Sequence, residues 1–374
     1  MRIVIDARLL AARDIGSSVY CRSLLRALSR REDEHDYWLI CQPGAGDSLG
    51  LDDRFRWVTL PEARLMDEPW EQLALPELLQ QLSPDVYLGL SSVLPATKTC
   101  PQATIIHDAG VADEPGFYST SLYRYLSTWL RAAAEQADLV FTVSHFSRAR
   151  LQSAYGILAS RVEVTCPAPD EMFWPRSEDE ERDRVLRLYG LAGSYLVTVA
   201  AMEPNKNLTA ILQAYRLAGA RAGLGQPLVL AGSPGSAEAA LSRQLDQLGL
   251  REDVVRTGYV PREHLPMLYS GATCFLWASL YEGFGLPPLE AMACGTPVIS
   301  SNRAAMPEVL GEAAVMVDPA QPAAMASALT LLVENEQMRQ RLRLAGLRRA
   351  AEFTWQRTAE LTVDGLMRIA RHER

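Results

Sequence analysis

Lysine is nearly absent from this chain of 374 residues, where Lys98 and Lys206 are the two lysines among 37 basic residues. Long apolar runs are also missing, since none approaches the ~20 residues that cross a bilayer. The six cysteines and five histidines are scattered, without a CxxC pair, which argues against a disulfide framework and a zinc site. The N-terminal MRIVIDARLL has no signal-peptide layout, so we expect a cytoplasmic protein.

The chain also has no excess of positive charge. It has 45 acidic residues against 37 basic ones, and its net charge is −8. A general basic surface for nucleic acid is therefore excluded. The hydrophobic fraction of 48% is that of an ordinary globular protein, and the length predicts two domains.

Short apolar runs alternate with longer helical patterns along the chain. The runs in the first half are Arg2–Asp6, Tyr37–Cys41, Trp57–Leu60, Val86–Leu88, Ala103–His107, Leu139–Val143 and Val162–Thr165. Those in the second half are Tyr195–Ala200, Pro227–Ala231, Val254–Arg256, Thr273–Trp277, Pro297–Ser300 and Ala314–Val317. The helical patterns include Val19–Leu28, Tyr123–Gln136, Leu208–Ala222 and Ala323–Glu334. This alternation predicts an α/β protein with doubly wound parallel sheets.

The alternation is interrupted once, at Cys166–Arg184, where three prolines precede a run of acids and arginines. We interpret this segment as a connector between domains at 1–170 and 171–355. A last helix over 356–374 either caps the second domain or crosses back onto the first. Two such domains are expected to face each other across a cleft at the carboxyl ends of both sheets.

The densest motif is LYEGFGLPPLEAMACGTPVIS, from Leu280 to Ser300. A strand ends before it, and the two prolines suit the first helical positions, so Glu290 is expected in the first helical turn. The backbone N–H groups of Gly283, Phe284, Gly285 and Leu286 would then point outward as an anion site. Glu282 and Glu290 would accept hydrogen bonds from pairs of vicinal hydroxyls. For Glu290 alone, the favourable helix dipole is an equally simple explanation.

The spacing Glu282-Gly-Phe-Gly-x4-Glu290, followed by Ala-Met-Ala-Cys-Gly-Thr-Pro-Val, resembles the E-x7-E region of the retaining glycosyltransferases of family four. The resemblance covers almost the whole chain and implies the GT-B fold, with two Rossmann-like domains. It also implies that Glu282 contacts the donor sugar and that Glu290 holds the nucleotide ribose. The intervening backbone amides would then bind sugar and diphosphate.

A second motif, AMEPNKNL at 201–208, follows the strand expected at Tyr195–Ala200. Lysine at the next helix N-terminus is placed to neutralise a diphosphate, although a solvated lysine is also common there. The family has a basic pair at this point, and here Asn205 replaces its arginine while Lys206 is retained. Arg303 is a candidate for the missing charge.

His107 follows an apolar strand in the first domain, at an HD dipeptide that in the family lies beside the transferred sugar. A strand-end histidine is otherwise structural, and we expect Asp108 to cap a local turn. The loop at 14–18 resembles the family's G-I-G-R-Y element. Asp14 replaces its first glycine, and Gly16 is retained for close approach to the donor.

Three further segments carry weaker signals. Thr142–Ser147 resembles a family N-cap lining the cleft, with His145 in place of the usual acid. Gly258–Val260 corresponds to the segment whose backbone, at Val260, holds the nucleotide base in relatives. Aromatic and basic residues at 123–131 form either a peripheral membrane contact or an ordinary helix with a buried aromatic face.

The resemblance implies a retaining glycosyltransferase, and we expect it to be metal-independent and to need no cofactor. The resemblance implies transfer of a hexose, with mannose favoured, from a GDP- or UDP-linked sugar to a carbohydrate or lipid-linked hydroxyl. Synthesis of cell-surface polysaccharide or glycolipid is the expected setting. The alternatives are a nucleotide-sugar epimerase or hydrolase of the same fold, and a nucleotide-sugar-binding protein without turnover.

Overall fold

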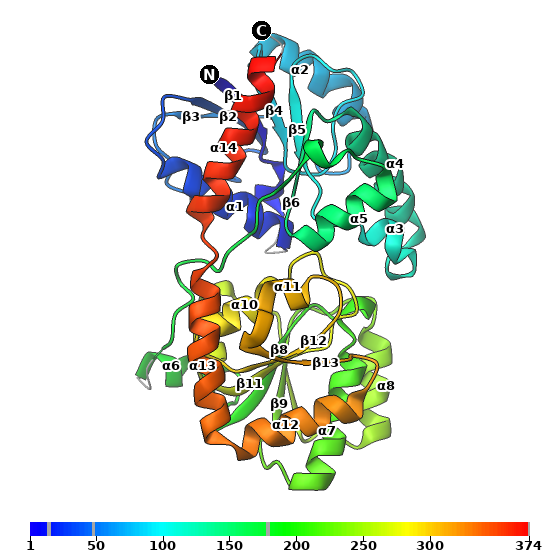
Figure 1. Cartoon of the computed structure of the whole chain (residues 1–374), viewed down its shortest axis with the longest axis vertical. Coiled ribbons are helices and arrows are strands. Elements are labelled where there is room, and N and C mark those ends of the chain that lie inside the picture. Colours follow the sequence, from blue (N-terminus) through cyan, green and yellow to red (C-terminus); the bar gives the residue numbers. More distant parts are fainter. Residues whose placement is uncertain (13–15, 47–48, 177–179, 373–374) are drawn as a thin grey trace. The chain divides into compact units, whose positions relative to one another are not determined.

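The computed structural model describes residues 1–12, 16–46, 49–176 and 180–372. The chain divides into two compact units (Figure 1). Unit 1 combines Met1–Pro167 with Thr354–Arg374, and unit 2 is Ala168–Phe353. The last helix therefore belongs to the unit that contains the N-terminus.

Unit 1 is built on a seven-stranded parallel sheet of order β3-β2-β1-β4-β5-β6-β7. Its strands are β1 (Arg2–Asp6), β2 (Asp36–Cys41), β3 (Phe55–Thr59), β4 (Val86–Gly89), β5 (Gln102–Ile105), β6 (Leu139–Thr142) and β7 (Val162–Val164). The central strands are buried along nearly their whole length, as expected for apolar runs covered on both faces. The expected strand at Ala103–His107 ends at Ile105, so His107 lies in the loop beyond it.

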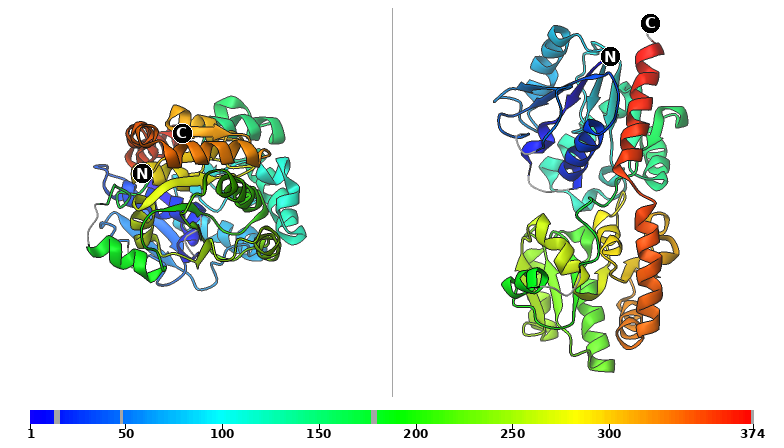
Figure 2. Two further views of the ribbon diagram at one scale, coloured as in Figure 1. Left: turned by 90° about the horizontal axis from the view of Figure 1, so that it is seen from below. Right: turned by 90° about the vertical axis from the view of Figure 1, so that its left-hand side faces the viewer.

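Helices cover both faces of this sheet. They are α1 (Gly16–Ser29), α2 (Leu75–Leu82), α3 (Gly110–Asp113), α4 (Thr120–Gln136), α5 (His145–Tyr155) and α14 (Trp355–His372). Residues of α2, α4 and α5 share a core with Val4, Tyr87 and Val140. Helix α14 lies beside α1, and α14 also contacts β4 and β6 (Figure 2). The returning helix thus completes the second apolar layer of unit 1.

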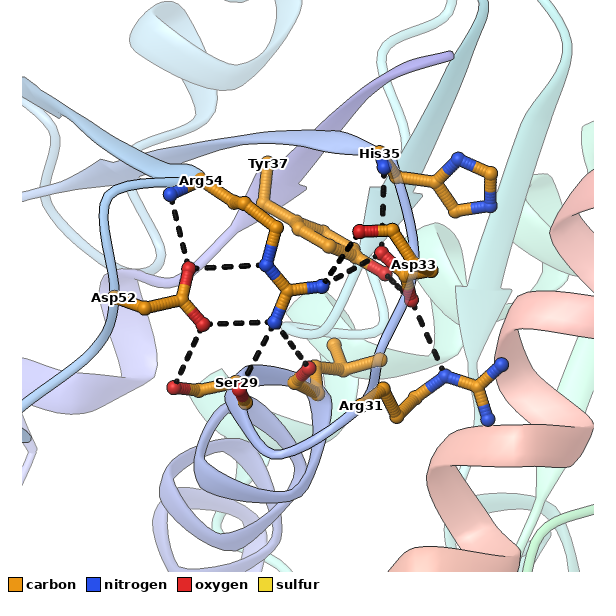
Figure 3. Close-up of polar contacts among 8 residues, drawn as sticks. Ser29, Arg31, Asp33, His35, Tyr37, Asp52 and Arg54 are labelled. Atoms are coloured by element: carbon orange, nitrogen blue, oxygen red, sulfur yellow. Dashed lines mark hydrogen bonds and ion pairs between the residues drawn. The ribbon is translucent and has the colours of Figure 1, made fainter.

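A polar network holds α1 against the amino ends of β2 and β3 (Figure 3). The Arg54 guanidinium donates to both Asp52 oxygens, at 3.0 and 2.7 Å, and to Asp33 Oδ1 at 2.8 Å. It also donates to the carbonyl of Ser29 at 2.9 Å, which satisfies a backbone acceptor at the end of the helix. This network lies at the edge of the sheet opposite to the carboxyl ends of the strands, so it serves stability.

Unit 2 has a six-stranded parallel sheet of order β10-β9-β8-β11-β12-β13. Its strands are β8 (Tyr195–Val199), β9 (Leu228–Ala231), β10 (Val254–Gly258), β11 (Ala272–Trp277), β12 (Val298–Ser301) and β13 (Ala314–Val317). From β8 the order runs outward in one direction, and from β11 in the other. The neighbouring carboxyl ends of β8 and β11 therefore form the topological switch point, where open α/β sheets bind ligands.

The helices of unit 2 alternate with these strands. They are α6 (Glu180–Leu188), α7 (Leu208–Ala222), α8 (Glu238–Leu248), α9 (Leu265–Ser270), α10 (Leu286–Ala293), α11 (Met306–Leu310), α12 (Pro322–Glu334) and α13 (Glu336–Ala351). Helices α7 and α8 connect the strands of one half of the sheet, from β8 to β10, and α10 and α11 connect those of the other half, from β11 to β13. Helix α12 packs along α7, and α13 packs along α10 (Figure 1).

The charged half of Cys166–Arg184 enters a helix, because α6 begins at Glu180. Glu180, Glu181 and Asp183 lie in its first turn, where carboxylates favour helix formation, and Val185 is buried on the apolar side.

Candidate functional site

Lys206 and Glu282 meet at the switch point of unit 2 although they are far apart in the sequence. Lys206 ends η5, a short 3-10 helix (Pro204–Lys206) just after β8, and Glu282 lies in the turn after β11. Lys206 Nζ donates to Glu282 Oε1 at 2.6 Å. Both side chains are partly exposed, at 21% and 14%. Two predicted site residues are thus brought together in reach of a ligand.

Ser279 orients the Glu282 carboxylate. Its buried hydroxyl donates to Glu282 Oε1 at 2.6 Å and also lies 3.0 Å from the carbonyl of Asn205. The N–H of Leu280 donates to that same carbonyl at 2.8 Å, so the turns after β8 and β11 are tied together. The Lys206 ammonium lies 5.2 Å from the ring centre of Trp277, a favourable cation–π distance.

Asn205 has a structural contact in this site. Its side-chain amide lies 3.5 Å from the carbonyl of Tyr281, and it carries no charge. Arg303, the candidate for the missing charge, is 54% exposed at its side chain and pairs with Asp318 at 3.0 Å. Lys206 is therefore the cation that directly contacts the site carboxylate.

The turn at 283–286 leads into α10 as the motif predicts. Gly285 is the N-cap residue with φ of +88°, and an added Cβ there would lie 2.3 Å from Met306 Cε. Glycine is required at this point. The N–H groups of Phe284, Gly285 and Leu286 make no hydrogen bond with any residue that the structure describes. Three donors at a helix N-terminus are thus available to an anion.

Glu290 differs from its expected place. Because α10 starts at Leu286, Glu290 lies in the second turn and is only 3% exposed. Arg262, which begins the 3-10 helix η6 (Arg262–His264), lies 3.1 Å from Glu290 Oε1, and the Tyr269 hydroxyl donates to Oε2 at 3.4 Å. Burial raises the pKa of Glu290, and the Arg262 charge opposes that rise.

Val260, the candidate for contact with the nucleotide base, follows β10 and is buried. The preceding Tyr259 is one of the exposed large side chains of unit 2, at 50%. This segment leads directly into η6 and Arg262, so the base candidate and the partner of Glu290 share one loop.

His107 is half-buried in unit 1, beside the ring of Tyr20. Burial lowers the pKa of its imidazole to about 4, so the ring is neutral at pH 7. Nε2 is buried and has no hydrogen-bond partner among the described residues, and the Tyr20 ring packs edge-on at 5.4 Å. A neutral imidazole with an unsatisfied nitrogen is suited to a hydroxyl ligand.

The neighbouring predictions in unit 1 have mixed outcomes. Asp108 accepts a hydrogen bond from the N–H of Gly110 at 2.7 Å, which confirms that its side chain bonds to the backbone of a local turn. Ser144 is the N-cap of α5 and accepts from the N–H of Ser147, as expected. Gly16 is the exposed first residue of α1. Asp14 lies outside the described residues.

The aromatic residues of α4 are only partly available for a membrane contact. Tyr125 donates to Glu71 Oε2 at 2.6 Å, and Arg131 lies over the ring of Tyr155 at 5.8 Å. Tyr123 is 37% exposed. Within the described ranges, no helix is both long and apolar enough to cross a bilayer. The same ranges hold no group of three or more His, Cys, Asp or Glu side chains arranged to bind a metal ion.

Sequence reasoning did not find Ser279, Arg262 and Tyr269 as parts of this site. Ser279 precedes Glu282 by only three residues, so their closeness in the sequence was the one available signal. Arg262 contacts Glu290 from a different strand–helix unit. A contact between residues so far apart in the sequence cannot be predicted from a local pattern.

Comparison with known protein families gives one match in each half of the chain. Residues 191–349 match the family described as glycosyl transferases group 1, and residues 15–171 match glycosyltransferase family 4. The O-antigen chain mannosyltransferase B of Escherichia coli is 36% identical over 263 residues, which are 70% of this chain and 68% of the relative. The serotype-specific mannosyltransferase WbdA of Escherichia coli is 32% identical over 64% of this chain, but this match spans only 30% of WbdA.

Solved structures share the fold at low identity. HepE from Anabaena, solved in complex with UDP and glucose, has a TM-score of 0.78 at 17% identity, over 98% of this chain and 99% of HepE. The chain belongs to the family-four glycosyltransferases, and its two parallel-sheet units are those of the GT-B fold.

Proposed function

We propose that this protein is a retaining hexosyltransferase that moves mannose from a nucleotide-diphosphate sugar to a hydroxyl of a carbohydrate or lipid-linked acceptor. Polysaccharide synthesis at the cell surface is the proposed setting, because the relatives at 36% and 32% identity are named as O-antigen chain and serotype-specific mannosyltransferases. GDP and UDP remain the two candidate carriers, and the fold relative HepE was solved with UDP.

The observation that carries this proposal is the meeting of Lys206, Glu282 and the N-terminus of α10 at one switch point. As the bond between the sugar and the diphosphate breaks, negative charge develops on the leaving diphosphate. In this proposal the Lys206 ammonium and the amides of Phe284, Gly285 and Leu286 would stabilise that charge, and no metal ion would be required. Donors that are already oriented toward the diphosphate would need little reorganisation.

Glu282 is proposed to hold the sugar. Ser279 and Lys206 both contact Oε1, so Oε2 is directed to accept from a sugar hydroxyl. In front-face retention the acceptor oxygen bonds to the anomeric carbon on the side that the diphosphate leaves. The acceptor proton then passes to a diphosphate oxygen, and no carboxylate nucleophile is required.

The remaining site residues are assigned to binding. Glu290 would hold the ribose hydroxyls, and the backbone at Val260 would contact the base. His107 would accept a hydrogen bond from, or donate one to, the transferred sugar, and Gly16 would allow close approach of backbone to the donor. Association of the lipid-linked acceptor with a membrane surface would bring the chain there without a spanning helix.

Ligand-induced stabilisation gives the first test. A donor present at about 100 times its dissociation constant stabilises the folded state by about 2.7 kcal/mol. We expect GDP-mannose or UDP-glucose to raise the melting temperature of the wild type. Glu282→Gln and Lys206→Met should abolish this shift, whereas Arg251→Met, which removes an exposed ion pair in the same unit, should not. No shift with any nucleotide sugar would contradict the proposal.

Turnover gives the second test. Labelled donor is incubated with a mannan or lipid-linked oligosaccharide, with and without EDTA, and the anomeric configuration of the product is read by NMR. An α-linked product from an α-linked donor, formed equally in EDTA, is expected. An inverted product would refute retention, and loss of activity in EDTA that added metal restores would refute metal independence.

A second candidate function is favoured by one observation. Asn205 supplies no charge, and the charge of Lys206 is already balanced by Glu282. A protein that binds nucleotide sugars without turnover would show the thermal shift but no transfer to any acceptor. Release of free sugar or of an epimer without acceptor would instead indicate a hydrolase or an epimerase.

A further inference from the structure

Glu290 poses a physical problem for the role proposed above. Its side chain is buried on α10, and burial in a medium of low dielectric favours the protonated, neutral carboxyl. A neutral carboxyl has one donor and reduced acceptor capacity, whereas a carboxylate accepts from two neighbouring hydroxyls at once. A group that holds ribose hydroxyls therefore needs a cation to keep its charge.

Arg262 meets this need from a different part of unit 2. Its guanidinium nitrogen Nη2 lies 3.1 Å from Glu290 Oε1, and the Arg262 side chain is only 16% exposed. The guanidinium also lies 4.9 Å from the ring centre of Phe173, which restricts its position. Both side chains of this ion pair are largely shielded from water, so the Coulomb attraction between them is stronger than in an exposed pair.

The groups around Glu290 come from several elements. Tyr269 on α9 donates to Oε2 at 3.4 Å, and Cys294 after α10 is a neutral thiol whose pKa burial raises above its ordinary value. Asp170, in the segment before α6, lies 4.0 Å from Arg262 and adds negative charge that opposes ionisation of Glu290. The Arg262 charge thus acts against both the burial of Glu290 and the nearby carboxylate, since each of these raises the pKa of Glu290 and the guanidinium lowers it.

We propose that Arg262 is a positioning residue for the donor nucleotide: its guanidinium keeps the Glu290 carboxylate charged and oriented to accept from the ribose 2′- and 3′-hydroxyls. The proposal rests on the function proposed above. Arg262 itself does not contact the nucleotide in this assignment. It follows that removing Arg262 weakens recognition of ribose hydroxyls specifically and makes that recognition dependent on pH.

The test is calorimetric titration of the whole chain with GDP and UDP, and with their 2′-deoxy forms, between pH 6 and 9. The wild type should prefer the ribonucleotide about tenfold across this range. Arg262→Met should lose most of this preference at pH 7 and recover part of it as the pH is raised to 9, because higher pH favours the ionised carboxylate. Its affinity for the 2′-deoxy form should stay within about twofold.

Three variants keep the result interpretable. Arg262→Lys retains the charge but not the planar fork, and should retain part of the preference. Glu290→Gln should lose the preference at every pH, and Arg251→Met should behave as wild type. Equal weakening of ribo and deoxy forms by Arg262→Met at all pH values would show a merely structural role and overturn the inference. A wild type that binds neither nucleotide would overturn the proposed function as well.

Discussion

The imidazole of His107, whose Nε2 is buried, makes unit 1 sensitive to mild acid. In the unfolded chain a histidine titrates near 6.5, whereas in the folded protein burial lowers the pKa of His107 to about 4. Below pH 6.5 the unfolded state therefore binds a proton that the folded state does not. The stability contributed by the neutral ring is complete above pH 6.5 and falls as the pH drops toward 4.

The size of this loss follows from the two pKa values. Each pKa unit corresponds to about 1.4 kcal/mol, so the full effect approaches about 3 kcal/mol at pH 4. Between pH 7 and pH 5, linkage predicts a loss of about 2 kcal/mol from His107 alone. A loss of this size is a considerable part of the stability of a typical domain.

The measurement is urea denaturation of wild type and His107→Asn at several pH values between 7 and 5. Because asparagine does not titrate, the variant should lose about 2 kcal/mol less of its free energy of unfolding over this range. His35, whose pKa is also lowered, remains in both proteins and cancels in the difference. Parallel pH profiles for the two proteins would refute the reasoning. So would an NMR titration, assigned by the signal missing from the variant, that places His107 above pH 6.

Two other substitutions test the packing around the site and the sheet. Gly285→Ala should cost more than about 2 kcal/mol in urea unfolding, because it combines a positive φ with a steric clash, whereas Gly249→Ala meets open space and should cost only about 1 kcal/mol. Equal costs would show that the clash relaxes. Arg54→Met should destabilise by about 1–3 kcal/mol through its lost carbonyl and carboxylate bonds, whereas Arg251→Met, which removes an exposed ion pair, should cost much less. A loss at Arg54 as small as at Arg251 would mean that water replaces these bonds.

The layout of the site was largely predictable from the sequence. The apolar runs ending at Val199 and Trp277 are continuous, so both read as strands buried in a parallel sheet. Residues that follow such strands gather at one edge, which is why Lys206 and Glu282 were expected in the same site. The helix start just after Gly285 could also be predicted, because the prolines at 287 and 288 suit the first positions of a helix.

The burial and the pairing of the acidic and basic side chains could not be predicted in this way. Whether Glu290 lies in the first turn or the second depends on where α10 begins, and that shift places it in the interior. Its partner Arg262 comes from another crossover unit. A pairing of this kind depends on how two helices pack on the same sheet, and no local pattern encodes it.

The sequence by itself determined the order of strands and helices, the family, and the residues that crowd the carboxyl edge of the second sheet. It did so because periodicity and turn chemistry act over a few neighbouring residues. Only the tertiary structure decided that α14 completes the N-terminal unit, that His107 is neutral, and that Glu290 shares its buried site with Arg262. Burial and charge pairing are properties of groups brought together across long stretches of chain, so they exist only once the chain has folded.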